Sequence, residues 1–179
     1  YKENGFREKK DALALIDRVQ GHSAIVESME KNISRKRAPL LFNLAELQAE
    51  CAKRFKISPD ETLQVAQDLY ERKLTTYPRT DARVLSTPVA KEIHKNIGGL
   101  RNYALAAPFA KEVLEQGTYK NIAKTRYVND KQITDHYAII PTGQGLNNLA
   151  GLAPTAAKVY EVIVRRFLSI FYPPAQYQT

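Results

Sequence analysis

The chain has 179 residues, enough for one domain with a hydrophobic core, and 44% of them are hydrophobic while 26% are charged. No stretch approaches the roughly 18 consecutive apolar residues of a membrane span, and a single cysteine excludes internal disulfides and multi-cysteine zinc sites. The net charge of +8 favours a polyanionic partner, which composition alone leaves open between nucleic acid and an anionic membrane surface.

Residues 1–39 differ in character from the rest and predict an α/β segment that connects to a neighbouring domain. Apolar side chains recur at helical spacing over 8–20, and a loose alternation predicts a strand over 22–33. The basic stretch 31–39 ends at a proline and is typical of a linker. Because the chain starts without a methionine or a secretory leader, we expect a fragment of a longer protein from a reducing compartment.

Residues 40–179 predict a mainly helical domain, which makes the fold class mainly α (α+β). Asn43 and Ser58 are each followed three residues later by a glutamate, the pattern of a helix N-cap with an acidic third position. They predict helices over 44–55 and 59–73, joined by a short turn. Such a pair resembles helix-turn-helix DNA readers, although capped helix pairs are common in any helical protein.

The remaining helices are predicted from capping and periodicity. Thr87-Pro88 predicts a helix that continues to about Asn96 and is stopped by Gly98-Gly99. Helical patterns cover 103–115 and 154–172, and no sustained period covers 117–150. Cys51 lies on the helical pattern of 44–55 and is expected to be a packed structural thiol.

An irregular segment, Leu74–Asp81, carries the residues best suited to chemistry. Pro78 disfavours the α region for Tyr77, so an extended strip is predicted in which Tyr77 and Arg79 point the same way. A guanidinium beside a phenol favours the phenolate and stabilises charge on phosphoryl oxygens, so the two residues could act on one phosphate. On spacing alone, a turn tyrosine next to a solvated arginine is the commoner interpretation.

Two motifs in this chain resemble those of a known enzyme family. Leu74–Asp81 (LTTYPRTD) is similar to the active-site signature of type IA DNA topoisomerases, particularly the topoisomerase III branch. Asp135–Thr142 (DHYAIIPT) resembles the family's His-x-Ala-Ile-x-Pro-Thr segment, in the family's order and about sixty residues downstream. The stretch 40–48 and the last predicted helix also resemble their counterparts, so the resemblance covers nearly the whole chain.

The resemblance implies a role for each matching residue. Tyr77 would be the nucleophile that forms a 5′-phosphotyrosyl link to a cut single strand, without ATP, and Arg79 would stabilise the scissile phosphate. His136 would contact the same phosphate region, and Asp81 would pair with His136 to hold its ring. Tyr137 is a departure, since many relatives carry an acidic residue or a second histidine there, which puts any role of that position in doubt.

The resemblance also implies parts that this chain lacks. The sequence contains no Asp-x-Asp pair, so the family's Mg²⁺ cluster is expected outside this chain and no metal site within it. The expected partners are single-stranded DNA and the remaining domains of the same polypeptide, with no membrane. The expected location is the cytoplasm, with nucleoid association if the protein is bacterial.

Basic residues predict where DNA would run, although a charge run is usually a solvated face. The predicted DNA-binding residues are Thr80, Arg83, Arg35, Lys36 and Arg37, with Lys31 beside them.

Other functions explain the sequence less completely. A tyrosine recombinase would need His-x-x-Arg before a tyrosine near the end of the chain, and here Tyr77 precedes His136. A non-enzymatic single-stranded DNA-binding module would account for the basic charge and ten tyrosines but not for the motif around Tyr77. A helical protein-interaction domain would leave both motifs unexplained.

Overall fold

The computed structural model describes residues 5–178, which divide into two units. One unit runs to Ser34 and includes Gln178, and the other spans Arg35–Tyr177. The first unit contains helix α1 (Lys9–Val19), which confirms the helix predicted over 8–20. α1 has no buried residues.

The strand predicted over 22–33 is wrong for most of its length. Residues 23–32 form neither helix nor strand and are all exposed, because their alternating side chains meet no second layer on which to pack. The strand β1 (Ile33–Lys36) begins at the end of that range, inside the stretch predicted as a linker, and it pairs with β2 (Ala175–Gln178) in a two-stranded sheet. β2 was not predicted from the sequence.

The first helices of the second unit are the capped pair that the sequence predicts. They are α2 (Leu44–Phe55) and α3 (Pro59–Glu71). The Asn43 side chain accepts a hydrogen bond from the Glu46 N–H at 2.9 Å, and the Ser58 hydroxyl accepts one from the Glu61 N–H at 3.1 Å. Each cap satisfies a backbone donor that the first helical turn leaves free, so both helices begin where the sequence predicts.

α4 (Thr87–Leu100) begins at the predicted residue but ends later than predicted. It continues through Gly98 and Gly99, the pair that the sequence predicts as its stop signal. A Cβ on Gly99 would overlap the carbonyl oxygen of Gly143, so glycine is needed there for close packing of two segments. The helix continues because Ile97 and Leu100 are buried in the core, and this packing outweighs the low helix propensity of glycine.

The other elements differ from prediction mainly at their ends. α5 (Ala107–Gln116) begins with Pro108 in its first turn, a position where the missing N–H costs nothing, and so it starts later than the predicted residue 103. α6 (Pro154–Ser169) ends earlier than the predicted residue 172. The aperiodic region contains short 3₁₀ helices: η1 (Thr118–Lys124), η2 (Asp130–Gln132) and η3 (Leu146–Gly151).

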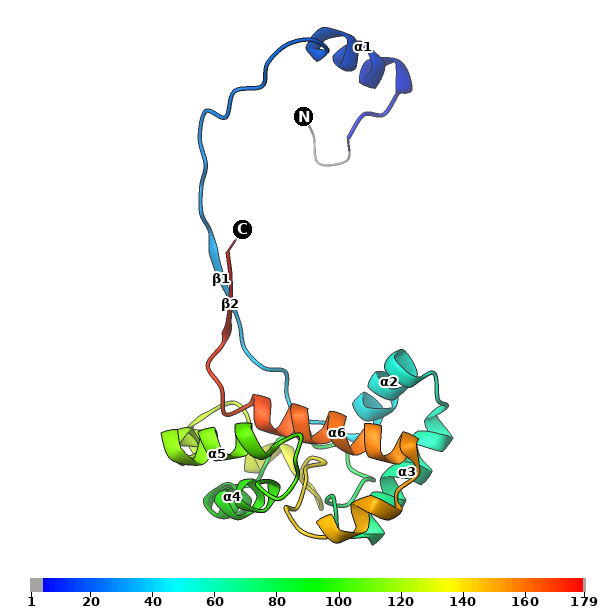
Figure 1. Ribbon diagram of the computed structural model, residues 1–179, viewed down its shortest axis with the longest axis vertical. Coiled ribbons are helices and arrows are strands. Elements are labelled where there is room, and N and C mark those ends of the chain that lie inside the picture. Colours follow the sequence, from blue (N-terminus) through cyan, green and yellow to red (C-terminus); the bar gives the residue numbers. More distant parts are fainter. Residues whose placement is uncertain (1–4, 179) are drawn as a thin grey trace. The chain divides into compact units, whose positions relative to one another are not determined.

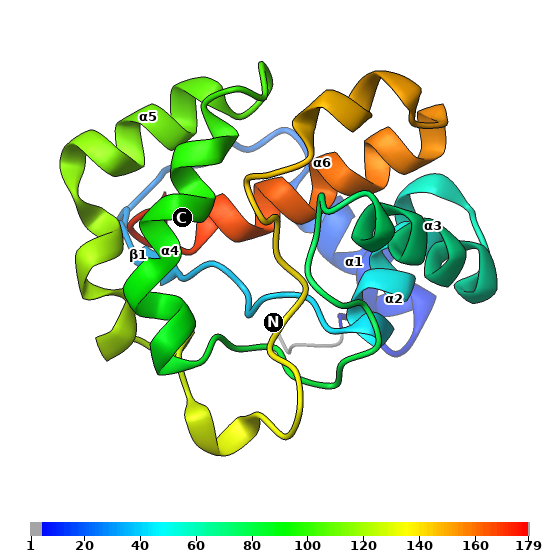
Figure 2. The ribbon, with the colours of Figure 1, turned by 90° about the horizontal axis from the view of Figure 1, so that it is seen from below.

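The core of the second unit is built around α6. Figures 1 and 2 show α4 and α5 gathered along one end of α6, and α2 and α3 at the other end. Val159, Tyr160, Ile163 and Phe167 of α6 are fully buried. The fold is therefore mainly helical, as predicted. Within residues 5–178, no helix is both long and apolar enough to cross a membrane.

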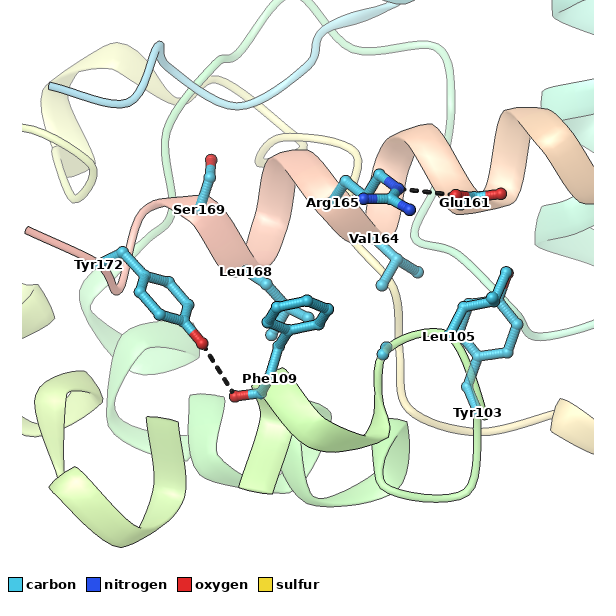
Figure 3. Close-up of a pocket in the computed structure, with 10 residues that line it drawn as sticks. Tyr103, Leu105, Phe109, Glu161, Val164, Arg165, Leu168, Ser169 and Tyr172 are labelled. Carbon is cyan, nitrogen blue, oxygen red and sulfur yellow. Dashed lines mark hydrogen bonds and ion pairs between the residues drawn. The ribbon is translucent and has the colours of Figure 1, made fainter. Parts of the chain in front are cut away.

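A small cavity of about 150 Å³ lies against α5 and α6 (Figure 3). Its lining is largely apolar, with Phe109 of α5 beside Leu168 of α6. The Tyr172 hydroxyl at its edge donates a hydrogen bond to the Glu112 carboxylate at 2.7 Å. Burial, aided by this carboxylate, raises the pKa of Tyr172 to about 12, so the phenol stays protonated at neutral pH.

α3 ends in a turn that usually contains glycine. The Lys73 N–H donates to the Tyr70 carbonyl at 2.8 Å and the Leu74 N–H to the Leu69 carbonyl at 2.9 Å, the paired bonds of a Schellman motif. Lys73 is left-handed, with φ of 63°, a conformation that costs a residue with a side chain about 1 kcal/mol. Lys56, which ends α2, is similar, with φ of 60°.

Candidate active site

The two sequence motifs, 74–81 and 135–142, are hydrogen-bonded to each other around Thr76. The Thr76 N–H donates to the Ile140 carbonyl at 3.0 Å, and the Ile140 N–H donates back to the Thr76 hydroxyl at 2.9 Å. That hydroxyl donates in turn to the Ala138 carbonyl at 3.0 Å. One threonine side chain therefore satisfies two backbone groups of the second motif.

Threonines also join the two motifs at both ends. The Thr80 hydroxyl donates to the His136 carbonyl at 3.1 Å and accepts from the Ala82 N–H at 3.1 Å. At the other end, the Thr142 N–H donates to the Leu74 carbonyl at 3.0 Å. Each such bond contributes about 1 kcal/mol, and together they hold the segments in one register.

The second motif is also anchored to the core. Ala138, Ile139 and Ile140 are buried, and the Ile139 N–H donates to the Phe42 carbonyl at 2.8 Å. His136 is exposed just before this apolar run. The histidine is therefore carried to the surface by a segment whose apolar residues fix its position.

This arrangement brings Tyr77 and His136 together. Their ring centroids are 4.4 Å apart, with the planes tilted by 41°. Tyr70, from the last turn of α3, also contacts Tyr77, with the two ring centroids 5.4 Å apart and the two ring planes nearly perpendicular. Tyr77 is half-buried, so its position is set by its neighbours while part of the side chain stays accessible to solvent.

These rings line a cavity of about 520 Å³. The residues that line it come from the end of α3 and from both motifs: Tyr70, Glu71, Lys73, Thr75, Thr76, Tyr77, His136, Tyr137, Thr142 and Gln144. The volume is in the range of ligand-binding clefts. Aromatic faces beside hydroxyl, amide and charged groups suit a nucleotide, whose base can stack and whose phosphate can accept hydrogen bonds.

Comparison with known proteins assigns the family. A family model described as DNA topoisomerase matches residues 1–179. The chain belongs to the type IA DNA topoisomerases. It is 38% identical over 165 residues to DNA topoisomerase 3 of Bacillus subtilis, covering 92% of this chain and 22% of that protein. It is 37% identical over 179 residues to DNA topoisomerase 3 of Shouchella clausii, covering 98% of this chain and 24% of that protein.

The fold is also similar to that of a solved family structure. Full-length topoisomerase I from Thermotoga maritima matches with a TM-score of 0.60 and 22% sequence identity, over 92% of this chain and 26% of that chain. At this identity the match shows the fold alone. The chain spans about a quarter of the length of the relatives it matches, between 22% and 24% for the two curated topoisomerases above.

Within this topoisomerase segment, Arg79 does not line the cavity that holds Tyr77. It is exposed and lines a second cavity of about 470 Å³ beside α3, together with Asp60, Asp68 and Glu71. Glu71 lines both cavities. Tyr77 and Arg79 therefore line different cavities, and their joint action on one phosphate stays a prediction.

Thr80 contacts the backbone of His136, and Asp81 contacts Asn43. Thr80 is buried, and its hydroxyl is hydrogen-bonded within the chain as described above, so it holds the motifs together and its predicted contact with DNA stays a prediction. Asp81 is exposed, and its backbone carbonyl accepts from the Asn43 side chain at 3.1 Å. Within the described residues, no hydrogen bond or ion pair joins the Asp81 carboxylate to His136, so that pairing too stays a prediction.

The predicted DNA-binding basic residues fall into two groups. Arg83 is engaged within the fold, since its guanidinium lies 3.2 Å from the Glu46 carboxylate and donates to the Leu41 carbonyl at 3.3 Å. Arg35 and Lys36 lie on β1, and Arg37 follows it, all with exposed side chains.

Tyr137, where this sequence departs from many relatives, is half-buried and lines the Tyr77 cavity. Burial raises the pKa of Tyr137, so its phenol is a hydrogen-bond donor rather than an anion at neutral pH. A neutral ring adds no negative charge beside the place where a phosphate would lie.

The described residues bring no cluster of metal ligands together. Over residues 5–178, no group of three histidine, cysteine or acidic side chains lies close enough together to hold an ion. That the Mg²⁺ implied by the family resemblance binds outside this chain stays a prediction.

Sequence reasoning did not identify Tyr70 and Lys73 as site residues. Both precede the first motif, and they line the cavity because α3 ends in a tight turn just before Leu74. The signal available in the sequence for Lys73 was a lysine at the end of a helix, where glycine is usual.

Proposed function

We propose that this chain carries the nucleophile of a type IA topoisomerase that breaks and rejoins single-stranded DNA. The main support is the hydrogen-bonded pairing of the two motifs, which puts the Tyr77 and His136 rings 4.4 Å apart at the edge of a cavity. A non-enzymatic DNA-binding module would need neither this pairing nor a tyrosine in contact with two other rings.

In the proposed reaction, the Tyr77 hydroxyl oxygen attacks a backbone phosphorus. A phosphotyrosyl bond forms and the bond from phosphorus to the 3′ oxygen breaks, while the phenol loses its proton and the leaving oxygen gains one. The 5′ end stays linked to Tyr77, and attack by the free 3′ hydroxyl reverses the step. One phosphodiester replaces another, so no ATP is needed, and the product differs from the substrate only in topology.

His136 is the group best placed to assist. Its exposed imidazole stands beside the Tyr77 ring and can donate a hydrogen bond to a phosphate oxygen while the bond rearranges. Arg79 would join it by turning from the acidic side chains of α3 toward the phosphate, and Asp81 would hold the His136 ring.

The other parts of the enzyme lie outside this chain. We infer that residues 1–39 connect residues 40–179 to a neighbouring domain, and that Mg²⁺ binds to acidic residues elsewhere in the polypeptide. Arg35, Lys36 and Arg37 would lie along the DNA, with Arg83 and Thr80 nearer the scissile phosphate. Since the relatives named above are bacterial topoisomerases, we expect the protein in the cytoplasm with the nucleoid.

Covalent capture tests the proposal. The full-length enzyme with Mg²⁺ should retain end-labelled single-stranded DNA after denaturation, and Tyr77→Phe should abolish the adduct. Tyr177→Phe, at an exposed tyrosine on β2, is the matched control and should retain it. Peptide mapping that placed the DNA on Tyr70 or Tyr127 would contradict the assignment.

A further inference from the structure

Lys73 stands out in the lining of the Tyr77 cavity. Among the described residues that line it, Lys73 is the one lysine or arginine. The lining also contains Glu71, whose carboxylate would repel a phosphate. A lysine in the same lining offsets that repulsion, so the cavity can accept a polyanion.

The backbone of Lys73 is held in place although its conformation is unfavourable for lysine. With φ of 63°, it occupies the glycine position of the turn that ends α3. Its carbonyl accepts from the Thr142 hydroxyl at 2.5 Å, which ties the base of the side chain to the second motif. The side chain itself is exposed. A strained residue at a site edge is a reason to look for a function of its side chain.

We propose that the Lys73 ammonium binds a DNA phosphate adjacent to the one attacked by Tyr77. The inference rests on the function proposed above and adds a positioning contact to it. An ammonium is a compact point charge on a flexible stem, which suits a backbone phosphate whose exact position varies with sequence. The contact would set the register of the strand and would carry no base specificity.

Replacement of Lys73 by glycine tests the proposed contact without destabilising the fold. Lys73→Gly removes the charge and places glycine where the backbone favours it, so the variant should melt at the same temperature as the parent or higher. Lys56→Gly is the matched control, because Lys56 has the same residue type and φ of 60° but ends α2 and does not line the cavity. Lys73→Gln removes the charge and keeps a side chain, and Lys73→Arg keeps the charge.

Binding of the full-length enzymes to a single-stranded oligonucleotide is measured against salt concentration. Loss of one phosphate contact reduces the log–log slope by about 0.7, which amounts to about fivefold weaker binding at 0.1 M salt if affinities converge at 1 M. Lys73→Gly and Lys73→Gln should both show this loss. Lys56→Gly and Lys73→Arg should bind like the parent.

The outcomes separate this inference from the function on which it rests. If Lys73→Gly matches Lys56→Gly in affinity and slope while the parent still forms an adduct at Tyr77, the Lys73 contact is refuted and the proposed function stands. If the adduct survives Tyr77→Phe, the proposed function fails whatever Lys73 does. A loss of slope in Lys73→Gly and Lys73→Gln, restored in Lys73→Arg, supports the contact.

Discussion

Thr75 and Thr76 are neighbours, but only the Thr76 hydroxyl is hydrogen-bonded among the described residues. Replacement of each threonine by valine should therefore change the free energy of unfolding in opposite directions. The Thr76 hydroxyl accepts from the Ile140 N–H and donates to the Ala138 carbonyl. The Thr75 hydroxyl is buried and has no hydrogen-bond partner among the described residues. Valine has nearly the shape of threonine, so the exchange tests the hydroxyl alone.

The expected magnitudes follow from these contacts. Thr76→Val leaves the buried Ile140 N–H without an acceptor, at about 1–3 kcal/mol, and the Ala138 carbonyl without its donor, at about 1 kcal/mol more. The free energy of unfolding should therefore fall by about 2–4 kcal/mol. Thr75→Val removes an unpaired buried hydroxyl and should raise it by about 1 kcal/mol.

Urea unfolding of the 179-residue chain, followed by circular dichroism, measures both changes. The midpoint should move down for Thr76→Val and up for Thr75→Val, with unchanged slopes. Two changes of the same sign and size would refute the idea that the Thr76 hydroxyl holds the motifs together. In the full-length enzyme, Thr76→Val should also reduce adduct formation, because the second motif carries His136.

Two further pairs of measurements follow from packing. Gly98→Ala should stabilise α4 by about 1 kcal/mol, since a Cβ at this position meets no other atom. Gly99→Ala should destabilise the chain by several times that amount, because its Cβ would overlap the Gly143 carbonyl. Equal shifts of the melting temperature for the two variants would contradict this. Cys51 should resist thiol reagents until the chain unfolds, because burial raises the pKa of its thiol to about 11. Because the pKa of the Cys51 thiol is raised above its ordinary value of 9.0 in the folded chain, the protonated thiol stabilises the fold below pH 9, and this stabilisation is lost as the pH rises toward 11. Over that pH range, the free energy of unfolding should therefore fall less for Cys51→Ala than for the parent.

Local signals in the sequence determined the start of several elements. The caps at Asn43 and Ser58 and the Ser-Thr-Pro start of α4 act on backbone groups within one helical turn, so residue identity is enough to place them. The same holds for the two motifs, since their residue types and order identify the family. Helix ends were less well predicted, because whether Gly98 and Gly99 stop a helix depends on what packs against them.

Only the tertiary structure decided which residues share a site. Tyr77 and Arg79 were predicted to face one phosphate by the alternation of an extended strip, yet they line different cavities. Lys73 lines the Tyr77 cavity, although the sequence did not predict it as a site residue. The sequence by itself determined the helix starts, the motifs and the nucleophile candidate, because these depend on residues close together in the chain. The pairing of the two motifs depends on hydrogen bonds between residues more than fifty positions apart, such as Thr80 and His136, and on the burial of residues 138–140, so it exists only in the folded chain.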